Sequence, residues 1–330
     1  MEFCGGHTHA ILRFGLRELL SPAIELRSGP GCPVCVTSAA DLNHAIGLAE
    51  VSGVILTTFG DMLRVPGSRG TLQEAHARGA DVRVVYSPLD ALEIARRNPQ
   101  QQVVFLGVGF ETTAPGIAAA LLQAETEALP NFSVLSLHKL TPPATRAILE
   151  AGEVALDGVI GPGHVSAITG SEAWEFLPRE YGIACAVSGF EPLDILSAIG
   201  ALVQAVIAEE PAVINTYARG VRPEGNLVAK QLLARVFEVG PANWRGFGVL
   251  PDSGLALRES FAHRDAARLF SVDAQPAPDP PGCRCGDVLR GVLLPTECPL
   301  FRRVCSPRNP IGPCMVSGEG ACAAYFQYET

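Results

Sequence analysis

The chain has 330 residues, 48% of them hydrophobic, a length that suits two globular domains with a small appendage better than one core. Its formal net charge is −9, and its lysines and arginines are scattered without a basic stripe, which argues against nucleic-acid binding. No signal peptide follows Met1, and the longest apolar stretch, 195–208, is too short to cross a bilayer, so we expect a cytoplasmic protein without a membrane partner.

The first motif places one thiol and two imidazoles within six residues. Cys4 is followed by two glycines, His7, Thr8 and His9. Glycines let the backbone fold so that these groups converge, and Cys and His are the usual ligands of soft or borderline metals. The motif favours metal or redox chemistry over a buried cysteine beside a polar turn.

A Cys-x-x-Cys pair follows in a turn flanked by glycine and proline. It comprises Cys32 and Cys35 within the segment 29–35. In a cytosolic α/β protein such a pair indicates redox activity or metal binding. A helix that begins after Cys32 would favour its thiolate form. No second Cys-x-x-Cys occurs to complete a zinc ribbon.

The central part of the chain alternates short apolar runs with amphipathic or alanine-rich stretches. This alternation predicts parallel sheets covered by helices, an α/β fold, and the number of strands suits two sheets. The predicted strands are 54–59, 82–86, 103–108, 132–137, 158–160, 183–187 and 212–216. The predicted helices are 89–97, 114–128, 143–152, 192–209 and 226–239.

Glycine-rich segments carrying polar residues follow several predicted strands. Asp61 and Glu111 follow two of them, and His164, a weaker candidate, follows a third. Chemistry in open α/β sheets lies beyond the carboxyl ends of strands. We expect the two carboxylates to hold a proton or orient thiols, or alternatively to cap the helices that follow.

A proline-rich linker at 276–281 ends the α/β pattern and precedes six cysteines. A tail this small and rich in Pro and Gly needs a metal centre to hold it together. Four thiolates suit a 4Fe-4S cluster or a zinc site, and their mostly wide spacing favours the cluster. The remaining two form a potential dithiol pair. The six are Cys283, Cys285, Cys298, Cys305, Cys314 and Cys322.

Taken together, the motifs resemble the HypD family of nickel–iron hydrogenase maturation factors over essentially the whole chain. The segments that carry the resemblance occur in the family's order. They are Cys4-Gly-Gly-His-Thr-His9, Gly29-Pro-Gly-Cys-Pro-Val-Cys35, Thr58-Phe-Gly-Asp-Met-Leu-Arg-Val-Pro-Gly67, Gly109-Phe-Glu-Thr-Thr-Ala-Pro115, Gly161-Pro-Gly-His164 and Pro310-Ile-Gly-Pro-Cys-Met-Val-Ser317.

The resemblance implies two α/β domains facing one another across a cleft, with a small domain that carries a 4Fe-4S cluster. We place the domains at 1–115, 116–275, with a possible return to the first near 215–275, and 276–330. It also implies a scaffold and redox protein, rather than a conventional turnover enzyme, in complex with the chaperone HypC. There an iron ion gains two cyanides, supplied by HypE, and one carbon monoxide before passing to the hydrogenase large subunit.

The resemblance further implies roles for individual cysteines. The family's spacing, Cys-x14-Cys-x6-Cys-x16-Cys, is met at every gap by the predicted cluster ligands Cys283, Cys298, Cys305 and Cys322. Cys285 and Cys314 correspond to a redox-active pair near the cluster. Cys4 corresponds to the iron-binding cysteine, and Cys32 and Cys35 to a second thiol pair at the cleft. Cys185 matches no functional cysteine and is expected in a buried strand.

Two hypotheses about mechanism follow from these roles. Electrons would pass from the cluster through Cys285 and Cys314 to Cys32 and Cys35. His7 would shuttle a proton or hydrogen-bond a bound cyanide, unless it only stabilises its turn.

The family normally carries a helical segment before the first motif, whereas Met1 stands three residues ahead of Cys4. We expect either a start codon placed too late or the loss of that segment.

Two rival functions use the same cysteines. A cluster-dependent thiol–disulfide reductase would need no iron at Cys4 and would show no cyanide bands. A zinc-stapled scaffold without a redox role would be colourless, whereas an anaerobic cluster protein is brown.

Overall fold

The computed structural model describes residues 1–272 and 278–329. The chain divides into two compact units, each built from segments that are not contiguous in sequence. Unit 1 comprises Met1–Val36, Thr141–Val228 and Gly282–Thr330, and unit 2 comprises Thr37–Leu140 and Ala229–Pro281. The ranges 1–115, 116–275 and 276–330 stay predictions about independent domains.

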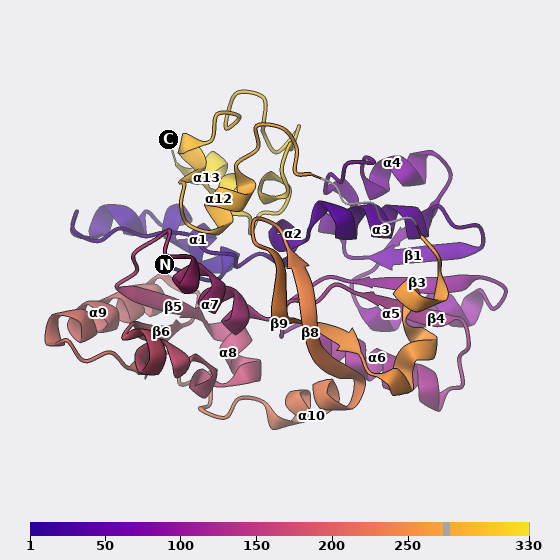
Figure 1. Ribbon diagram of the computed structural model, residues 1–330, viewed down its shortest axis with the longest axis horizontal. Helices are drawn as coiled ribbons and strands as arrows, with labels where there is room; N and C mark the ends of the chain where they lie inside the picture. The colour runs from indigo at the N-terminus through magenta and orange to yellow at the C-terminus, as the bar shows by residue number, and fades with distance from the viewer. Residues whose placement is uncertain (273–277, 330) are drawn as a thin grey trace. The chain divides into compact units, whose positions relative to one another are not determined.

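Unit 2 contains a parallel four-stranded sheet of order β2-β1-β3-β4. Figure 1 shows helices α3 and α4 on one side of this sheet and α5 and α6 on the other. The strands are β1 (Val54–Thr58), β2 (Asp81–Val84), β3 (Gln102–Gly107) and β4 (Phe132–Ser136). The helices are α3 (Ala39–Ala49), η2 (Gly60–Arg64), α4 (Leu72–Ala77), α5 (Pro88–Arg97) and α6 (Ala114–Thr126).

The chain reverses direction across this sheet between β1 and β3, since β2 lies on one side of β1 and β3 on the other. Ligands in open α/β sheets bind beyond the carboxyl ends of strands at such a switch point. Side chains from α5, α6 and both central strands form the core beneath, including the fully buried Ile55, Leu92, Phe105 and Leu121. The strand sequences do not alternate between apolar and polar residues, because both faces of the sheet are buried.

An antiparallel hairpin completes unit 2 and was not predicted. It consists of β8 (Phe237–Trp244) and β9 (Gly248–Leu257), and η5 (Glu259–Arg264) and α11 (Ala266–Leu269) follow. The helix predicted over 226–239 is α10 (Leu227–Val236), which ends where β8 begins. The predicted helix runs on into β8, whose Phe237 is buried while both Glu238 and Val239 are exposed. This burial pattern lacks the period-2 alternation by which a strand is predicted.

Unit 1 contains a parallel three-stranded sheet of order β5-β6-β7. Helix α9 packs on β6 and β5, and its Ile195, Ile199 and Leu202 join Ile11 and Ile160 in the core. The strands are β5 (Gly158–Pro162), β6 (Ala184–Ser188) and β7 (Val213–Asn215). The helical elements are α1 (Gly5–Arg13), η1 (Leu16–Leu19), α2 (Pro33–Val36), α7 (Thr141–Ala151), α8 (Gly163–Thr169), η3 (Ser171–Trp174), η4 (Leu177–Tyr181) and α9 (Pro192–Ala208).

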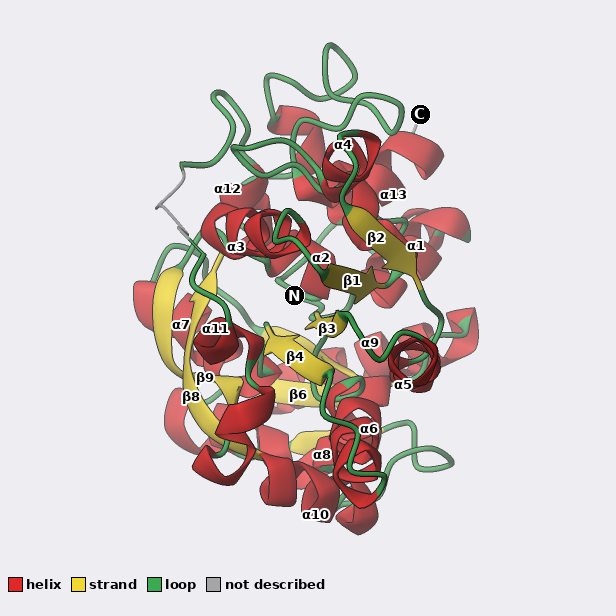
Figure 2. Cartoon of the chain, turned by 90° about the vertical axis from the view of Figure 1, so that its right-hand side faces the viewer, coloured by secondary structure: helices red, strands yellow, loops and turns green. Residues whose placement is uncertain are grey.

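The Cys-rich segment at the end of the chain belongs to unit 1 and is mostly loop (Figure 2). Its short elements are α12 (Cys285–Leu289), η6 (Pro295–Glu297), η7 (Pro313–Met315) and α13 (Ala321–Tyr328). Helix α13 packs against α1. The guanidinium of Arg17, in η1, lies over the ring of Tyr325, in α13, 4.8 Å from the ring centroid. The first thirty-six residues and the tail are thus one structural unit.

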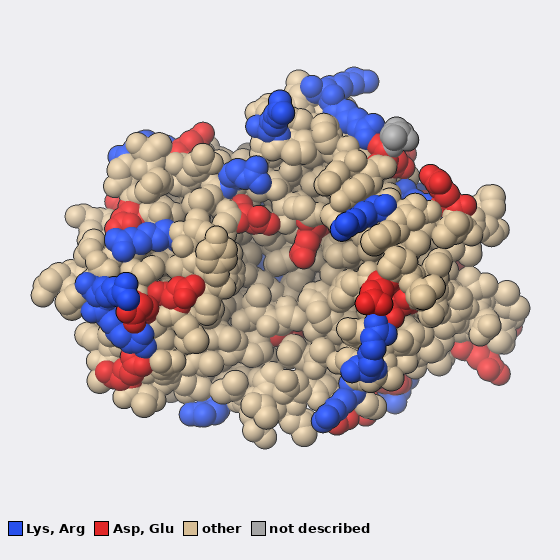
Figure 3. Space-filling model, turned by 180° about the vertical axis from the view of Figure 1, so that it is seen from behind, with Lys and Arg blue, Asp and Glu red and all other residues tan. Residues whose placement is uncertain are grey.

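All seven predicted strands are present, in parallel sheets, so the predicted α/β class is confirmed. Cys185 is fully buried in β6, as expected. Residues 276 and 277 of the predicted linker lie outside the described residues, and 278–280 have no regular structure. Within the described residues, no helix combines the length and apolar character that crossing a bilayer requires. Acidic and basic side chains are interspersed over most of the face in Figure 3.

Candidate iron and thiol site

Cys4 is the N-cap of α1, where it meets a histidine from the first turn of α8, directly after β5. Its Sγ is 3.8 Å from Nδ1 of His164 and 4.0 Å from Nε2. The backbone N–H of Gly6 points at the same sulfur, at 3.3 Å. Burial, followed by the charge of Glu2, raises the pKa of the Cys4 thiol well above its ordinary value. Without a metal, the thiol is therefore neutral at physiological pH.

Glu2 is a buried carboxyl group that holds the turn containing Cys4. Its Oε2 accepts the Cys4 N–H at 2.9 Å, and its Oε1 accepts the Thr8 hydroxyl. Burial raises the pKa of Glu2 to about 7, and the hydrogen bonds from Thr8 and Cys4 oppose that rise. Sequence reasoning missed this residue, although it stands two positions before the first motif.

The two histidines of this region flank one aromatic ring. His7 stacks on Phe190 with ring centroids 4.8 Å apart, and His164 lies 5.3 Å from Phe190 on a tilted plane. Burial lowers the pKa of each histidine to about 4, so both are neutral at pH 7. Phe190 follows β6, so the rule about strand ends would have found it.

The two ring nitrogens of His7 have different roles: Nε2 donates a hydrogen bond, and Nδ1 is left as an acceptor. Its Nε2 lies 2.9 Å from the carbonyl oxygen of Gly189, and because a carbonyl only accepts, Nε2 carries the proton. Within the described residues, the buried Nδ1 has no hydrogen-bond partner. In this neutral form, Nδ1 can accept a proton or a hydrogen bond but cannot donate one to a cyanide.

Cys32 and Cys35 are both buried at the start of the one-turn helix α2. The N–H of Cys35 donates to Sγ of Cys32 at 3.3 Å. Burial, followed by the neighbouring Cys35 thiol, raises the pKa of Cys32 well above its ordinary value. The helix does begin directly after Cys32, but one turn carries little dipole, so burial outweighs any stabilisation of a thiolate.

Cys314 lies in contact with several other buried thiols. Its Sγ lies 2.6 Å from Sγ of Cys285, although both cysteines are free. Hydrogen bonds with Cys285, Cys322 and Cys35, together with burial, hold the pKa of Cys314 well above its ordinary value. The structure thus brings the predicted tail pair together and places the Cys-x-x-Cys motif against it.

The four predicted cluster ligands differ in burial, and several of them lie near this group of thiols. Cys283 and Cys298 are half-buried, whereas Cys305 and Cys322 are buried. Burial, followed by the nearby Cys285, raises the pKa of Cys283 to about 12, and Cys322 and Cys298 add to that effect. Among the described residues, no three Cys, His, Asp or Glu side chains form a ready-made metal cage.

Glycines allow the N-terminal and C-terminal cysteine motifs to pack this closely. A Cβ on Gly31 would lie 2.3 Å from the backbone nitrogen of Cys4, and one on Gly5 would lie 1.9 Å from the carbonyl oxygen of Glu319. Neither position can hold a side chain without moving backbone. The exposed Glu319 also lies close enough to raise the pKa of both Cys4 and Cys32, as a minor effect.

Asp61 and Glu111 both lie in unit 2, beyond the carboxyl ends of the neighbouring strands β1 and β3. Asp61 is exposed, whereas Glu111 is 3% exposed. Neither occupies the N-cap position of the helix that follows, which is Phe59 for η2 and Thr113 for α6. The predicted site residues therefore divide between units, with all ten cysteines in unit 1.

Lys139, at the end of β4, is a fully buried lysine that sequence reasoning missed. Its Nζ lies 3.5 Å from Oδ2 of Asp41 and 6.0 Å from the centre of the Trp244 ring. Burial lowers the pKa of Lys139, and Asp41 opposes that fall. A lysine after a predicted buried strand is the only sequence signal that points to it.

Comparison with known proteins shows which family this chain belongs to. The family model described as "HypD: Hydrogenase formation hypA family" matches residues 1–329. The chain belongs to the HypD family. It is 50% identical over 335 residues to the hydrogenase maturation factor HypD of Azotobacter vinelandii, covering 99% of this chain and 88% of the relative.

Two further relatives in the HypD family are nearly as similar. The hydrogenase maturation factor HypD of Cupriavidus necator is 48% identical over 336 residues, which cover 99% of this chain and 89% of the relative. The factor of the same name from Escherichia coli K12 is 46% identical over 329 residues, covering 99% and 88%. The resemblance inferred from the motifs is therefore confirmed.

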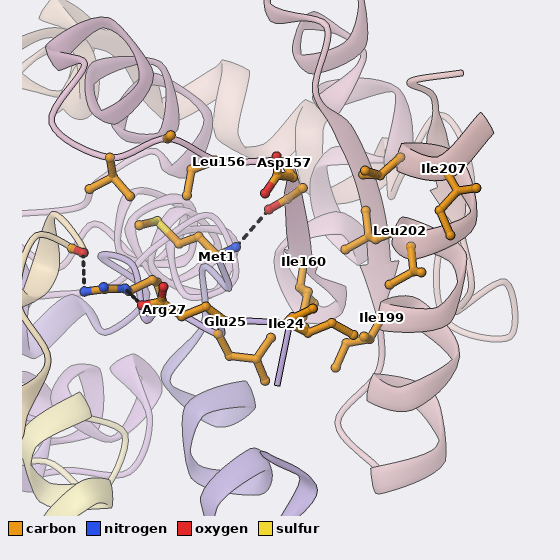
Figure 4. A pocket seen from close by; sticks show the side chains of 18 of the residues that line it. Met1, Ile24, Glu25, Arg27, Leu156, Asp157, Ile160, Ile199, Leu202 and Ile207 are labelled. Carbon is orange, nitrogen blue, oxygen red and sulfur yellow. Dashed lines mark hydrogen bonds and ion pairs between the residues drawn. The ribbon is translucent and has the colours of Figure 1, made fainter. Parts of the chain in front are cut away.

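A cavity of about 600 Å³ lies elsewhere in unit 1, at the amino end of β5 (Figure 4). Ile199, Leu202 and Ile207 of α9 line one side of it. The Met1 ammonium group donates to the carbonyl oxygen of Gly158 at 2.8 Å, and burial lowers its pKa to about 6. Because its lining holds no cysteine or histidine, we assign the cavity no part in thiol chemistry.

Proposed function

We propose that the chain is a scaffold and redox protein that assembles the Fe(CN)2CO group of nickel–iron hydrogenase in complex with the chaperone HypC. The main structural support is the contact between Cys4 and His164. Nine further cysteines lie in the same unit. Family membership supports the role in hydrogenase maturation. The proposal extends to HypE as cyanide donor, to the large subunit as recipient and to a cytoplasmic location.

The iron is the substrate, and Cys4 is its proposed protein ligand. Soft thiolates suit a low-spin ferrous ion that carries cyanide and carbon monoxide. Because the isolated thiol is neutral, iron must displace its proton, and His164 is the nearest group that can accept it. The N-terminal cysteine of the partner would supply a second thiolate.

The proposed resident cofactor of the protein is a 4Fe-4S cluster. Cys283, Cys298, Cys305 and Cys322 would hold it, and the donor set fits because four thiols gather in a segment with few apolar side chains. When bound, the cluster would supply one electron at a time. Three of the four thiols already lie near one another, since Cys298 and Cys322 both add to the rise in the pKa of Cys283.

The buried thiols offer a route for electrons from the tail to the Cys-x-x-Cys motif of Cys32 and Cys35. Cys314 contacts Cys285 and Cys35, and Cys35 neighbours Cys32. A disulfide at either pair takes up two electrons and two protons on reduction, and exchange between neighbouring thiols would pass the oxidation along. Asp61 and Glu111 stay candidates for holding protons beyond the carboxyl ends of β1 and β3 in unit 2.

Infrared spectroscopy tests the scaffold role. The full chain is purified anaerobically after co-expression with HypC and the cyanide-supplying proteins, and we expect bands of metal-bound cyanide and carbon monoxide. Cys4→Ala should abolish them. Cys185→Ala is the matched control, because Cys185 is equally buried but lies in β6 away from the other thiols, and it should retain them.

One rival function has support of its own. The 2.6 Å approach of Cys285 to Cys314 would equally serve a cluster-dependent thiol–disulfide reductase. A brown protein that reduces substrate disulfides but shows no cyanide bands would favour this rival over the scaffold.

A further inference from the structure

The tail contains a stretch whose charge is opposite to that of the whole chain. Residues 298–312 include three arginines and no Asp or Glu, whereas the complete sequence has 34 acidic and 25 basic residues. In Figure 3, blue side chains gather at the top of the view, over the C-terminal segment. The arginines are Arg302, Arg303 and Arg308.

The arginines lie on a loop that its own hydrogen bonds hold in shape. Phe301 bridges to Cys305, and Ser306 bridges to Asn309. The side chain of Asn309 donates to the Val304 carbonyl at 3.0 Å. The N–H of Ile311 points at Sγ of Cys305 at 3.4 Å, so the loop closes over that cysteine.

Two of the three arginine side chains have no partner among the described residues. Arg302 donates to the carbonyls of Tyr325, Phe326 and Glu329 and so caps the end of α13. The side chains of Arg303 and Arg308 are exposed and make no hydrogen bond or ion pair to any residue in 1–272 or 278–329. Val304 beside them is 54% exposed and adds an apolar contact.

The two unpaired cations lie near one proposed cluster ligand, Cys305. Arg303 is two residues before Cys305 and Arg308 three residues after it. A chain extends at most about 3.6 Å per residue, so the Cα atom of either arginine is within about 11 Å of that of Cys305. Arg303 and Arg308 thus lie on the solvent side of a loop whose inner side holds a predicted ligand.

We propose that residues 302–309 are the docking surface of a small acidic one-electron carrier protein that reduces the cluster. This inference rests on the proposed cluster. Each docked carrier is oxidised by one electron, so two carriers dock in turn for every disulfide reduced, and the thiols take two protons from solvent.

Charge favours docking of an acidic carrier at this loop. A chain of net charge −9 repels an acidic protein over most of its surface, so an unpaired basic patch both attracts and orients it. Electron-transfer encounters are small and weak, which suits two arginines and one valine. A nucleic acid would need many more cations along its backbone.

The test measures binding to a redox-inert probe, a small acidic 2Fe-2S ferredoxin with gallium in place of iron. The full chain carries Arg303→Glu and Arg308→Glu, and the control carries Arg97→Glu and Arg179→Glu, two exposed arginines with the same total charge change. We expect the test variant to bind about ten-fold more weakly at low salt, and the control within about two-fold of the parent.

Other outcomes overturn the inference. Equal weakening in both variants would mean that net charge alone matters. Tighter binding of single-stranded RNA or anionic vesicles than of the ferredoxin would make the loop a general polyanion site. Unchanged binding in the test variant would place the carrier elsewhere.

A second readout separates this inference from the proposed function. With native reduced ferredoxin, rapid mixing should show slower bleaching of the brown chromophore in the test variant, while dithionite, a small reductant, bleaches both variants equally fast. A colourless parent protein would refute the cluster itself, and the binding comparison would still decide whether the loop docks an acidic protein.

Discussion

The thiol of Cys4 and the imidazole of His164 lie in contact, 3.8 Å apart between Sγ and Nδ1, although 160 positions separate them in the sequence. Burial keeps the thiol protonated and the imidazole neutral. The pair can therefore rearrange into thiolate and imidazolium only when a cation or an electrophile arrives. This gives His164, the weakest of the sequence candidates, the most direct contact with the proposed iron ligand.

Replacing His164 with Asn should slow alkylation of Cys4. The imidazole is the acceptor nearest to the thiol proton, and one hydrogen bond of about 1 kcal/mol corresponds to a rate change of about 3- to 10-fold. Iodoacetamide labelling at pH 8, read by mass spectrometry of the Cys4 peptide, measures it. His7→Asn is the comparison, since His7 donates to Gly189 and should leave the rate nearly unchanged.

Mild oxidation of the metal-free protein should join Cys285 to Cys314 before any other pair. Their sulfur atoms are already 2.6 Å apart, so little motion is needed. Peptide mapping after treatment with diamide should find this bond first, and in Cys285→Ser it should find Cys35 joined to Cys314. Cys185 should stay reduced, and an early Cys32–Cys35 bond would contradict the order.

Gly31→Ala should destabilise the fold and displace Cys4. The added methyl group would meet the Cys4 backbone at 2.3 Å, so backbone must move, at a cost of about 1–3 kcal/mol or more. Urea unfolding measures the free energy. Gly200→Ala in the exposed face of α9 is the control, because its methyl group meets nothing within 4 Å and should stabilise the helix by about 0.5–1 kcal/mol.

Asp41→Asn should cost more stability than Lys139→Met. The first change leaves a buried ammonium without its counter-charge, at about 3 kcal/mol or more, whereas the second leaves Asp41, which is 21% exposed, within reach of water. The double variant should recover most of the loss in urea unfolding. If the two single changes simply add, the ion pair carries no coupling energy.

Acid should weaken unit 2 partly through His138. Burial, followed by the charge of Lys139, lowers its pKa from 6.5 to about 3, so between these values only the unfolded state binds the proton. Stability therefore falls as the pH drops from 6.5 toward 3, by about 1.4 kcal/mol per pH unit for this group. His138→Asn should make the plot of unfolding free energy against pH shallower by that amount, and an unchanged slope would contradict the assignment.

The local patterns of this sequence determined its elements and the kinds of chemistry it carries. Apolar runs such as 103–108 and the helical stretch at 192–209 lie where strand and helix formed, because burial on both faces or on one stripe leaves a periodic trace in the chain. The cysteine spacing likewise singled out thiol and metal chemistry. Strands β8 and β9 were not predicted, nor were several helices, among them α1, α3 and α13. The buried and exposed positions of β8 lack the period-2 alternation that signals a strand.

Tertiary structure alone decided which of these residues meet. It placed Cys35 against Cys314, His164 beside Cys4 and the buried Glu2 under the first motif, and it assigned Asp61 and Glu111 to the other unit. Such contacts depend on how α1, α2 and α13 pack, which glycines at positions 5 and 31 permit by letting backbones approach. No local period records a contact between residues hundreds of positions apart, because the energy that selects it belongs to the packed unit rather than to any one segment.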